Sequence, residues 1–218
     1  MSPNSHTAPD EVIAALRDLG TATVYEAQGG HGALASANKP IDPASRLAGR
    51  ALTVDAAPAD NLVIHHAITK AQAGDVIVID AKSFVEAGPW GDVLREAALA
   101  RGIAGLVIDG AVRDSASIAT MKFPVFARGV SIKGTGKNQP SRVGEAITVG
   151  GVLIQTGDVI VGDRDGVVVV ATEEAEKTLQ RARERAAKED GFRRAIREGR
   201  TTVELMHFEE SLNRLHLT

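Results

Sequence analysis

The chain of 218 residues contains no cysteine. Disulfide bonds, thiolate zinc sites, iron–sulfur clusters and cysteine nucleophiles are therefore excluded. Aromatic residues are scarce, with five phenylalanines, one tryptophan and one tyrosine, which argues against a platform that stacks single-stranded nucleic acid. The net charge of −3 provides no attraction to a polyanion, so no nucleic-acid partner is expected. The remaining chemistry is that of carboxylates, basic side chains, hydroxyls, backbone amides or a hard metal ion.

Long apolar runs are also missing. No run approaches the ~20 residues that a membrane span needs, so no membrane partner is expected. The first nine residues are polar and lack the basic and apolar regions of a signal peptide. We interpret residues 1–9 as a disordered lead-in and expect a cytoplasmic location. The length predicts one domain, or one domain with an appendage.

The first part of the chain alternates between strand and helix patterns. Residues 74–80 and 104–109 are apolar, β-branched runs, typical of strands that are buried on both faces. Further strands are predicted over residues 51–54 and 124–127, and helices over residues 10–19, 61–72, 92–101 and 114–121. This β-α-β-α-β order predicts an α/β fold with a largely parallel central sheet.

The pattern changes after residue 128. Short strands are predicted over residues 146–149, 152–154, 158–161 and 167–170, in an antiparallel arrangement. Residues 173–200 form a charged helix of mixed sign, typical of a solvated or subunit-bridging helix. Gly199 ends it, and a final helix over residues 201–215 carries Val203, Leu205, Met206, Phe208 and Leu212. We therefore expect a domain over residues 10–172 and a C-terminal helical arm over residues 173–218 that packs on a neighbouring subunit.

Several short motifs carry little weight. Residues 129–134 have the spacing of a phosphate-binding P-loop, but Thr135 stands where that loop needs a lysine. Residues 30–35 fit a loose dinucleotide fingerprint without a convincing strand before it. His65 and His66 are adjacent and would point about 100° apart on a helix, so we expect a structural role for both. No GxSxG elbow anchors a hydrolase triad.

The informative feature is an Asp-x20-Arg-Asp spacing, formed by Asp92, Arg113 and Asp114. Asp92 opens a predicted helix whose free N–H groups and dipole favour a carboxylate or phosphate. Arg113 and Asp114 follow the next predicted strand, at the edge where open α/β sheets place their ligands. An arginine there binds a keto-acid carboxylate or an enolate, and an aspartate holds Mg²⁺ or Mn²⁺. Alternatively, Asp92 only caps the helix and Arg113–Asp114 is a surface ion pair; both interpretations stay open.

At these residues the sequence resembles the RraA-like family, and within it the class II 4-hydroxy-4-methyl-2-oxoglutarate/4-carboxy-4-hydroxy-2-oxoadipate aldolases, which carry the same Asp-x20-Arg-Asp motif. The likeness extends over most of the chain. It includes residues 22–29, 60–61, 74–78, 157–163, 165–170 and 189–199. The resemblance implies an α/β/β fold of the swivelling-domain type, assembled as a homo-oligomer (trimer or hexamer) with active sites between subunits.

The resemblance also implies an activity: metal-dependent cleavage of 4-hydroxy-2-oxo di- and tricarboxylates to pyruvate and a second keto acid, with oxaloacetate decarboxylation beside it. Asp114 would hold Mg²⁺ or Mn²⁺ largely through waters, and Arg113 would stabilise the pyruvate enolate. Asp92, or Glu189 of the next subunit, would orient a water that acts as base. The implied substrate-binding residues are Gly91, Asp92, Val93 and Leu94, through their amides, with Arg113 and Asn61.

Two segments depart from the aldolases. The loop over residues 129–145 and the last helix, residues 201–207, look like generic RraA-like members, so the native substrate stays open. Glu184 and Glu198 lie on the same predicted helix as Glu189. The alternative from another class is a non-catalytic regulator that binds a ribonuclease; the resemblance implies that this branch tends to lack Asp92. A methyltransferase is disfavoured, because no Gly-rich strand–turn–helix with a following acidic residue is present to hold a methyl donor.

Overall fold

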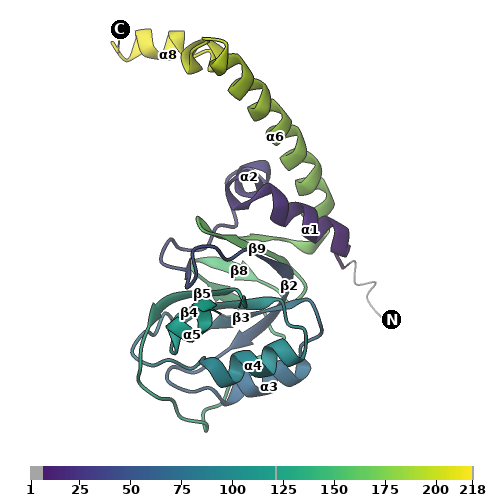
Figure 1. Cartoon of the computed structure of the whole chain (residues 1–218), viewed down its shortest axis with the longest axis vertical. Helices are drawn as coiled ribbons and strands as arrows, with labels where there is room; N and C mark the ends of the chain where they lie inside the picture. Colours follow the sequence, from purple (N-terminus) through teal and green to yellow (C-terminus); the bar gives the residue numbers. More distant parts are fainter. Residues whose placement is uncertain (1–6, 121, 218) are drawn as a thin grey trace.

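The computed structural model describes residues 7–120 and 122–217. Its centre is a mixed sheet of eight strands in the order β1-β5-β4-β3-β2-β9-β10, with β6 paired to β2 (Figure 1). These strands are β1 (Lys39–Pro40), β2 (Leu47–Asp55), β3 (Asp75–Asp80), β4 (Gly105–Val112), β5 (Val125–Val130), β6 (Arg142–Val143), β9 (Val159–Asp163) and β10 (Gly166–Val170). A separate hairpin pairs β7 (Ile147–Val149) with β8 (Val152–Ile154).

Strands β2 to β5 form the parallel part of the sheet. Helices α3 (Leu62–Lys70), α4 (Asp92–Ala100) and α5 (Ser115–Thr120) connect them in turn. All eight residues of β4 are buried, as are five of the six residues of β3, because both faces of these strands are covered. In the second half of the chain, β9 pairs antiparallel with β2 and β10, and β7 with β8. The predicted α/β class is confirmed.

The hydrophobic core has three parts. One lies between the sheet and helices α3 and α4, with Ile64, Ile79 and Leu94 among its members. A second lies on the other face, where the β7–β8 hairpin packs around Phe126. The third joins the first two helices and the start of α6 to β9 and β10. Each fully buried aliphatic side chain contributes roughly 1.5–3 kcal/mol, so the α3–α4 layer is held firmly against the strands that precede the Asp-x20-Arg-Asp residues.

The N-terminal helices are α1 (Asp10–Leu19) and α2 (Thr21–Ala27). Gly20 separates them at φ 83°, as its predicted role as a helix stop requires. Residues 1–6 of the predicted lead-in lie outside the described residues. Residues 7–9 do not extend it, because Ala8 is buried and its N–H donates to the Thr172 hydroxyl at 3.1 Å. The ordered fold therefore begins before residue 10.

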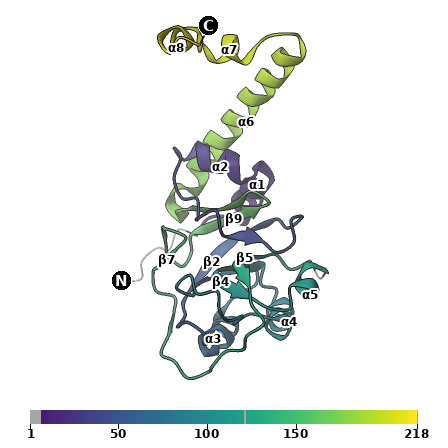
Figure 2. The same cartoon turned by 90° about the vertical axis from the view of Figure 1, so that its left-hand side faces the viewer.

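The C-terminal arm consists of η1 (Thr172–Glu174), α6 (Ala175–Arg197), α7 (Thr202–Met206) and α8 (Glu209–Arg214). Only the first turns of α6 are buried, and the rest of the arm projects away from the sheet (Figures 1 and 2). The prediction of one helix over residues 201–215 is wrong, because His207 adopts a left-handed conformation (φ 55°) and divides it in two. None of the apolar side chains of α7 and α8 is fully buried in this chain, and their docking on a neighbour stays a prediction. Among the described helices, none is long and apolar enough to cross a membrane.

Candidate functional site

The N-terminus of α4 is reached through a tight loop over residues 88–91. Trp90 anchors this loop: its side chain is fully buried and stacks on Phe123, with ring centroids 6.0 Å apart. The carbonyl of Trp90 accepts a hydrogen bond from the Arg113 N–H at 2.8 Å. This backbone bond joins the loop before α4 to the end of β4. The two halves of the Asp-x20-Arg-Asp spacing are therefore neighbours in space.

Asp114 completes this junction. Its side chain accepts a hydrogen bond from the Asp92 N–H at Oδ2 (3.1 Å), and the same oxygen lies 3.7 Å from Arg113 Nε. Asp114 itself is left-handed, at φ 57°. A non-glycine residue in that region is uncommon, and such backbone strain is concentrated at functional sites.

Two glycines make this close approach possible. A Cβ at Gly91 would lie 2.5 Å from Asp114 Oδ2 and 3.0 Å from Arg113 Nε. At Gly88 it would lie 2.5 Å from the Ser131 carbonyl oxygen. A side chain at Gly91 would push Arg113 and Asp114 away from the helix start, and one at Gly88 would push Arg113 and the Ser131 backbone away. The residues around the motif are thus matched to it sterically.

The amides at the start of α4 are partly engaged. The Asp92 N–H donates to Asp114, and the Val93 N–H donates to Asp92 Oδ1 at 2.7 Å. Asp92 is exposed and is the first residue of the helix, where a carboxylate is favoured by the dipole. A bound carboxylate would compete with the Asp114 side chain for the Asp92 N–H and with the Asp92 side chain for the Val93 N–H. The interpretation of Asp92 as the helix cap is wrong, because the N-cap of α4 is Gly91, without a side-chain cap bond, and Asp92 is the first helical residue.

Asn61 lies at the start of α3 and is buried. Its Nδ2 donates to the Pro89 carbonyl oxygen at 3.0 Å, which ties α3 to the loop before α4. The preceding residue, Asp60, accepts backbone N–H bonds from Leu62 (3.0 Å), Asn138 (2.7 Å) and Gln139 (3.2 Å). Burial would raise the pKa of Asp60, but these three bonds, together with the charge of Lys137, outweigh it and lower that pKa. The α3 start is therefore bonded both to the α4 loop and to the 136–139 segment.

These elements enclose a cavity of about 190 Å³. Five of the predicted site residues line it, and so do three residues that the sequence analysis did not propose for the site. The lining residues are Asn61, His65, Pro89, Gly91, Val93, Leu94, Arg113 and Lys137. Asp92 and Asp114 adjoin it through their bonds to this wall. The cavity combines a helix start, an amide side chain and cations, which suits a small carboxylate ligand.

His65 and Lys137 are the functional candidates that sequence reasoning missed. The structural role expected for His65 is not what the structure shows: the residue is exposed and lines the cavity. Partial burial lowers the pKa of His65, and the nearby charge of Lys137 lowers it further. The i, i+4 spacing from Asn61 could have placed His65 on the same helix face. Lys137 has no such signal, because a tertiary contact brings its loop to α3.

A divalent ion fits this site with few protein ligands. No group of three or more His, Asp and Glu side chains that could hold a metal exists among the described residues. Asp114 has a partly exposed side chain, and its Oδ2 is already bonded to an N–H. One carboxylate with a free oxygen beside an open cavity is a donor set that suits a hydrated Mg²⁺, which keeps several waters when bound. The residues therefore agree with the ion that the resemblance implies.

Glu189 is not brought to this cavity within one chain. It lies on α6, which leaves the sheet on the side away from α3 and α4 (Figures 1 and 2). Its carboxylate pairs with Arg185 at 3.0 Å and Arg193 at 3.1 Å, and Arg185 also pairs with Glu26 of α2. A role for Glu189 in catalysis therefore requires a second copy of the chain.

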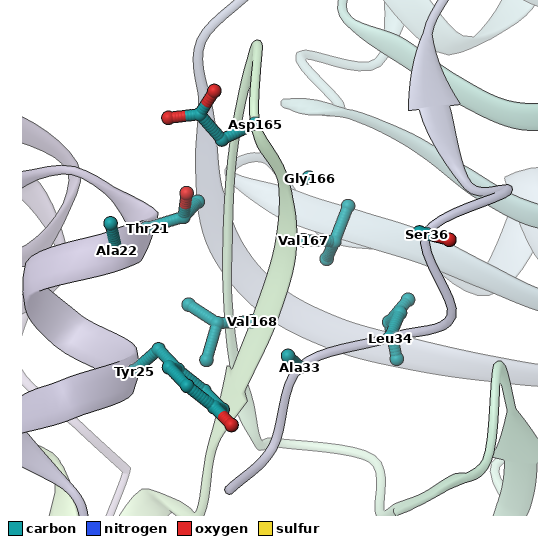
Figure 3. Close-up of a pocket in the computed structure, with 10 residues that line it drawn as sticks. All are labelled: Thr21, Ala22, Tyr25, Ala33, Leu34, Ser36, Asp165, Gly166, Val167 and Val168. Atoms are coloured by element: carbon teal, nitrogen blue, oxygen red, sulfur yellow. The ribbon is translucent and has the colours of Figure 1, made fainter. Parts of the chain in front are cut away.

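A slightly larger cavity of about 210 Å³ lies between α2 and β10 (Figure 3). Its walls are mostly small and apolar, with Ala33 and Val168 next to Tyr25, and its one charged lining residue is Asp165. Without a lining cation, it offers nothing to balance an anionic ligand. The cavity at α4, although smaller, is the one with the matching chemistry.

The RraA-like family model (Aldolase/RraA) matches residues 21–169. A protein of Halalkalibacterium halodurans provisionally named 4-hydroxy-4-methyl-2-oxoglutarate aldolase is 38% identical over 186 residues, which cover 85% of this chain and 89% of the relative. A solved structure of an uncharacterized protein from Pseudomonas syringae pv. tomato is similar at a TM-score of 0.85 and 29% identity, covering 94% of this chain and 98% of that one.

A Streptomyces coelicolor protein, described as an unusual member of the RNase ES inhibitor RraA family, is also similar. Its TM-score is 0.78 at 25% identity, over 86% of this chain and 99% of that one. The predicted RraA-like fold is confirmed by these likenesses. With a family match over more than half its length and a relative of this identity, the chain belongs to the RraA-like family.

Proposed function

We propose that the protein is a divalent-metal-dependent aldolase. It cleaves 4-hydroxy-2-oxo di- or tricarboxylates to pyruvate and a second keto acid, and it decarboxylates oxaloacetate as a side reaction. The observation that carries the proposal is the meeting of Arg113, Asp114 and the α4 N-terminus at one cavity. The name of the Halalkalibacterium halodurans relative supports the same reaction class.

Arg113 provides the main electrostatic contribution. Its guanidinium lines the cavity and is partly exposed, and its contact with Asp114 Oδ2 is long, at 3.7 Å. Its donors are therefore available to a ligand. When the C3–C4 bond of the substrate breaks, its electron pair moves towards the C2 oxygen as the pyruvate enolate forms. A fixed cation beside that oxygen stabilises the developing charge.

The start of α4 binds the substrate carboxylate in this proposal. Gly91 and Leu94 line the cavity, and the helix dipole favours an anion there. Asn61 fixes the α3 edge of the same wall through Pro89. These contacts hold the keto acid in one orientation, with its C2 oxygen towards Arg113.

Asp114 would hold the proposed Mg²⁺ or Mn²⁺, an ion that keeps several waters when bound. When bound, such an ion polarises the keto oxygen as a Lewis acid. The tie between Asp114 Oδ2 and the Asp92 N–H fixes the carboxylate next to the cavity wall. This leaves its other oxygen to face solvent or an ion.

A water molecule acts as the base that removes the proton of the C4 hydroxyl, and within one chain Asp92 orients this water. The proton leaves as the carbonyl of the second product forms, and the enolate is later protonated at C3. Glu189 takes part only in an assembly in which the arm of one subunit reaches the cavity of another. We therefore include a homo-oligomer, a trimer or hexamer, in the proposal, with a cytoplasmic location.

The test couples pyruvate release to a dehydrogenase, with oxaloacetate and a 4-hydroxy-2-oxo diacid as substrates. We expect activity with Mg²⁺ or Mn²⁺, loss of activity with a chelator, and strong losses in Asp92→Ala and Arg113→Ala. Arg101→Ala, at the exposed far end of α4, is the matched control and should keep full activity. Absence of metal-dependent pyruvate, or unchanged rates in both site variants, would contradict the proposal. Inhibition of a ribonuclease by the inactive chain would instead support a regulator.

A further inference from the structure

Two contacts with the same spacing join α4 to the segment that follows β4. In the first, the Asp92 N–H donates to Asp114 Oδ2 at 3.1 Å. In the second, Arg95 Nη1 donates to the carbonyl oxygen and to the hydroxyl of Ser117, both at 3.0 Å. Arg95 comes three residues after Asp92, and Ser117 three residues after Asp114, so the partners lie one turn apart on the same helix faces. The bond to Ser117 therefore repeats the contact at the motif one turn further along α4.

Arg95 is an unusual residue at this place, because its side chain is only 2% exposed. Glu96 is its carboxylate partner at 3.0 Å, but the side chain of Glu96 is 59% exposed. Among the described residues, the buried Arg95 Nε has no hydrogen-bond partner. A buried charge with incomplete pairing costs desolvation energy, and an apolar side chain of similar size is often at least as stable. Stability of the fold therefore does not explain an arginine here, and such exceptions are expected at functional sites.

Helix α5 depends on contacts of this kind for its position. It has six residues, and a helix of this length is not stable by itself. Of these six residues, Ile118 is the one that is buried. The Ile118 N–H donates to the Asp114 carbonyl oxygen at 3.0 Å, so the first turn of α5 starts from Asp114 itself. A shift of α5 would therefore change the backbone of Asp114, which is held in a left-handed conformation at φ 57°.

We propose that Arg95 is a positioning residue for Asp114. By fixing Ser117 against α4, Arg95 keeps α5 in one place, and this holds the Asp114 carboxylate next to the start of α4. Arg95 is not among the described residues that line the cavity, so it acts through α5 and touches neither ion nor substrate. The inference rests on the proposed function, for the ion that Asp114 would hold, and deepens it. Loss of a group that orients a metal ligand typically costs about 10–100-fold in metal affinity.

The test measures Mn²⁺ binding to the intact protein without substrate, by electron paramagnetic resonance, together with urea unfolding of the same preparations. Arg95→Met introduces an apolar side chain of similar length that cannot donate to Ser117. We expect it to bind Mn²⁺ at least about 10-fold more weakly than the wild type, with a urea midpoint that is unchanged or higher. Arg95→Lys keeps the charge and a donor for Ser117, so its Mn²⁺ affinity should lie between the other two.

Glu96→Ala is the matched control. It removes the ion pair of Arg95 but leaves both bonds to Ser117 in place, so its Mn²⁺ affinity should equal that of the wild type. Ser117→Ala tests the same contact from its other side. It removes the hydroxyl acceptor and keeps the carbonyl acceptor, so it should weaken Mn²⁺ binding by less than Arg95→Met does.

The proposal is overturned if the wild type does not bind Mn²⁺, if both Arg95 variants bind it as tightly as the wild type, or if Glu96→Ala loses as much affinity as Arg95→Met. It is also overturned if the Mn²⁺ affinity of the two Arg95 variants falls in step with their urea midpoints, because Arg95 would then only stabilise the fold. A failure of the aldolase proposal is distinct from these outcomes: it would appear as no pyruvate release while the Mn²⁺ affinities keep the expected order.

Discussion

Two charged clusters at the edge of the parallel sheet each contain an arginine, Arg128 in one and Arg113 in the other, but differ in how their charges are paired. In the first, Arg128 binds the buried carboxylate of Asp109 on β4 through two nitrogens, at 2.7 and 2.6 Å, and the Ser83 hydroxyl binds the other oxygen at 2.8 Å. In the second, Arg113 and Lys137 face a cavity with little or no local pairing. The comparison indicates that the first cluster stabilises the fold, whereas the second is open to a ligand.

Lys82 extends the paired cluster. It bridges Asp55 at the end of β2 and Asp80 at the end of β3, at 2.5 and 2.6 Å. Burial would lower the pKa of Lys82, but the two carboxylates outweigh it and raise that pKa. Internal ion pairs therefore occupy the carboxyl ends of β2 and β3 and the Asp109 position within β4. The ligand site is displaced to the loop after β4 and the start of α4.

The largest expected effect is on stability, at the paired cluster. Asp109→Ala leaves Arg128 partly buried without its partner, which should reduce the free energy of unfolding by about 3 kcal/mol or more. Urea unfolding measures it. The double variant Asp109→Leu/Arg128→Met should recover much of this loss, because an apolar pair needs no charge compensation. A loss below about 1 kcal/mol in Asp109→Ala would contradict the contrast between the clusters.

The second effect is on activity, at the open cluster. Arg113→Ala should lower kcat for pyruvate release by about 10²–10³-fold, the range seen when a group that stabilises an oxyanion is removed. Its free energy of unfolding should stay close to that of the wild type, since the side chain is 43% exposed and weakly paired. Steady-state kinetics and urea unfolding of the same preparation test both statements. A stability loss as large as that of Asp109→Ala would remove the distinction.

The third effect depends on pH and concerns Asp60, whose pKa is lowered in the folded protein from an ordinary value of 3.8. A lowered pKa contributes stability that is present above about pH 4 and is lost as the pH falls through the folded value. Asp60→Asn should therefore be less stable than the wild type near pH 7, by about 1–3 kcal/mol. The two proteins should approach each other below pH 4, and unfolding curves across this range test it. A constant difference at all pH values would show that the charge of Asp60 is unimportant.

The smallest effect is expected at Lys82. Its side chain is 46% exposed, so solvent screens its two ion pairs. Lys82→Met should cost about 1 kcal/mol or less and leave the activity unchanged. The same unfolding and kinetic measurements apply, with the wild type at high salt as the control. A marked loss of activity would connect the paired cluster to the site and so revise the comparison.

The fold was largely predictable from the residues. The apolar runs in β3 and β4 follow directly from burial on both faces, and the helices between them have ordinary start and stop residues. The C-terminal arm was less predictable. Its final helix breaks at His207, a residue with no breaking tendency like that of glycine or proline, and Met206 and Phe208 stay exposed in one chain. Local sequence cannot show which surface such side chains will meet.

The site, like the fold, was predictable from the sequence only in part. The sequence by itself determined the Asp92, Arg113 and Asp114 spacing and its place after one helix and one strand, because both depend on periodicity along the chain. Only the tertiary structure decided that Lys137 and His65 share a cavity with Arg113, that Gly91 leaves room for Asp114, and that Glu189 lies away from all of them. The physical reason is distance along the chain. The segment of Lys137 reaches α3 because the Asn138 N–H donates to Asp60, and no local pattern encodes a contact across 78 residues.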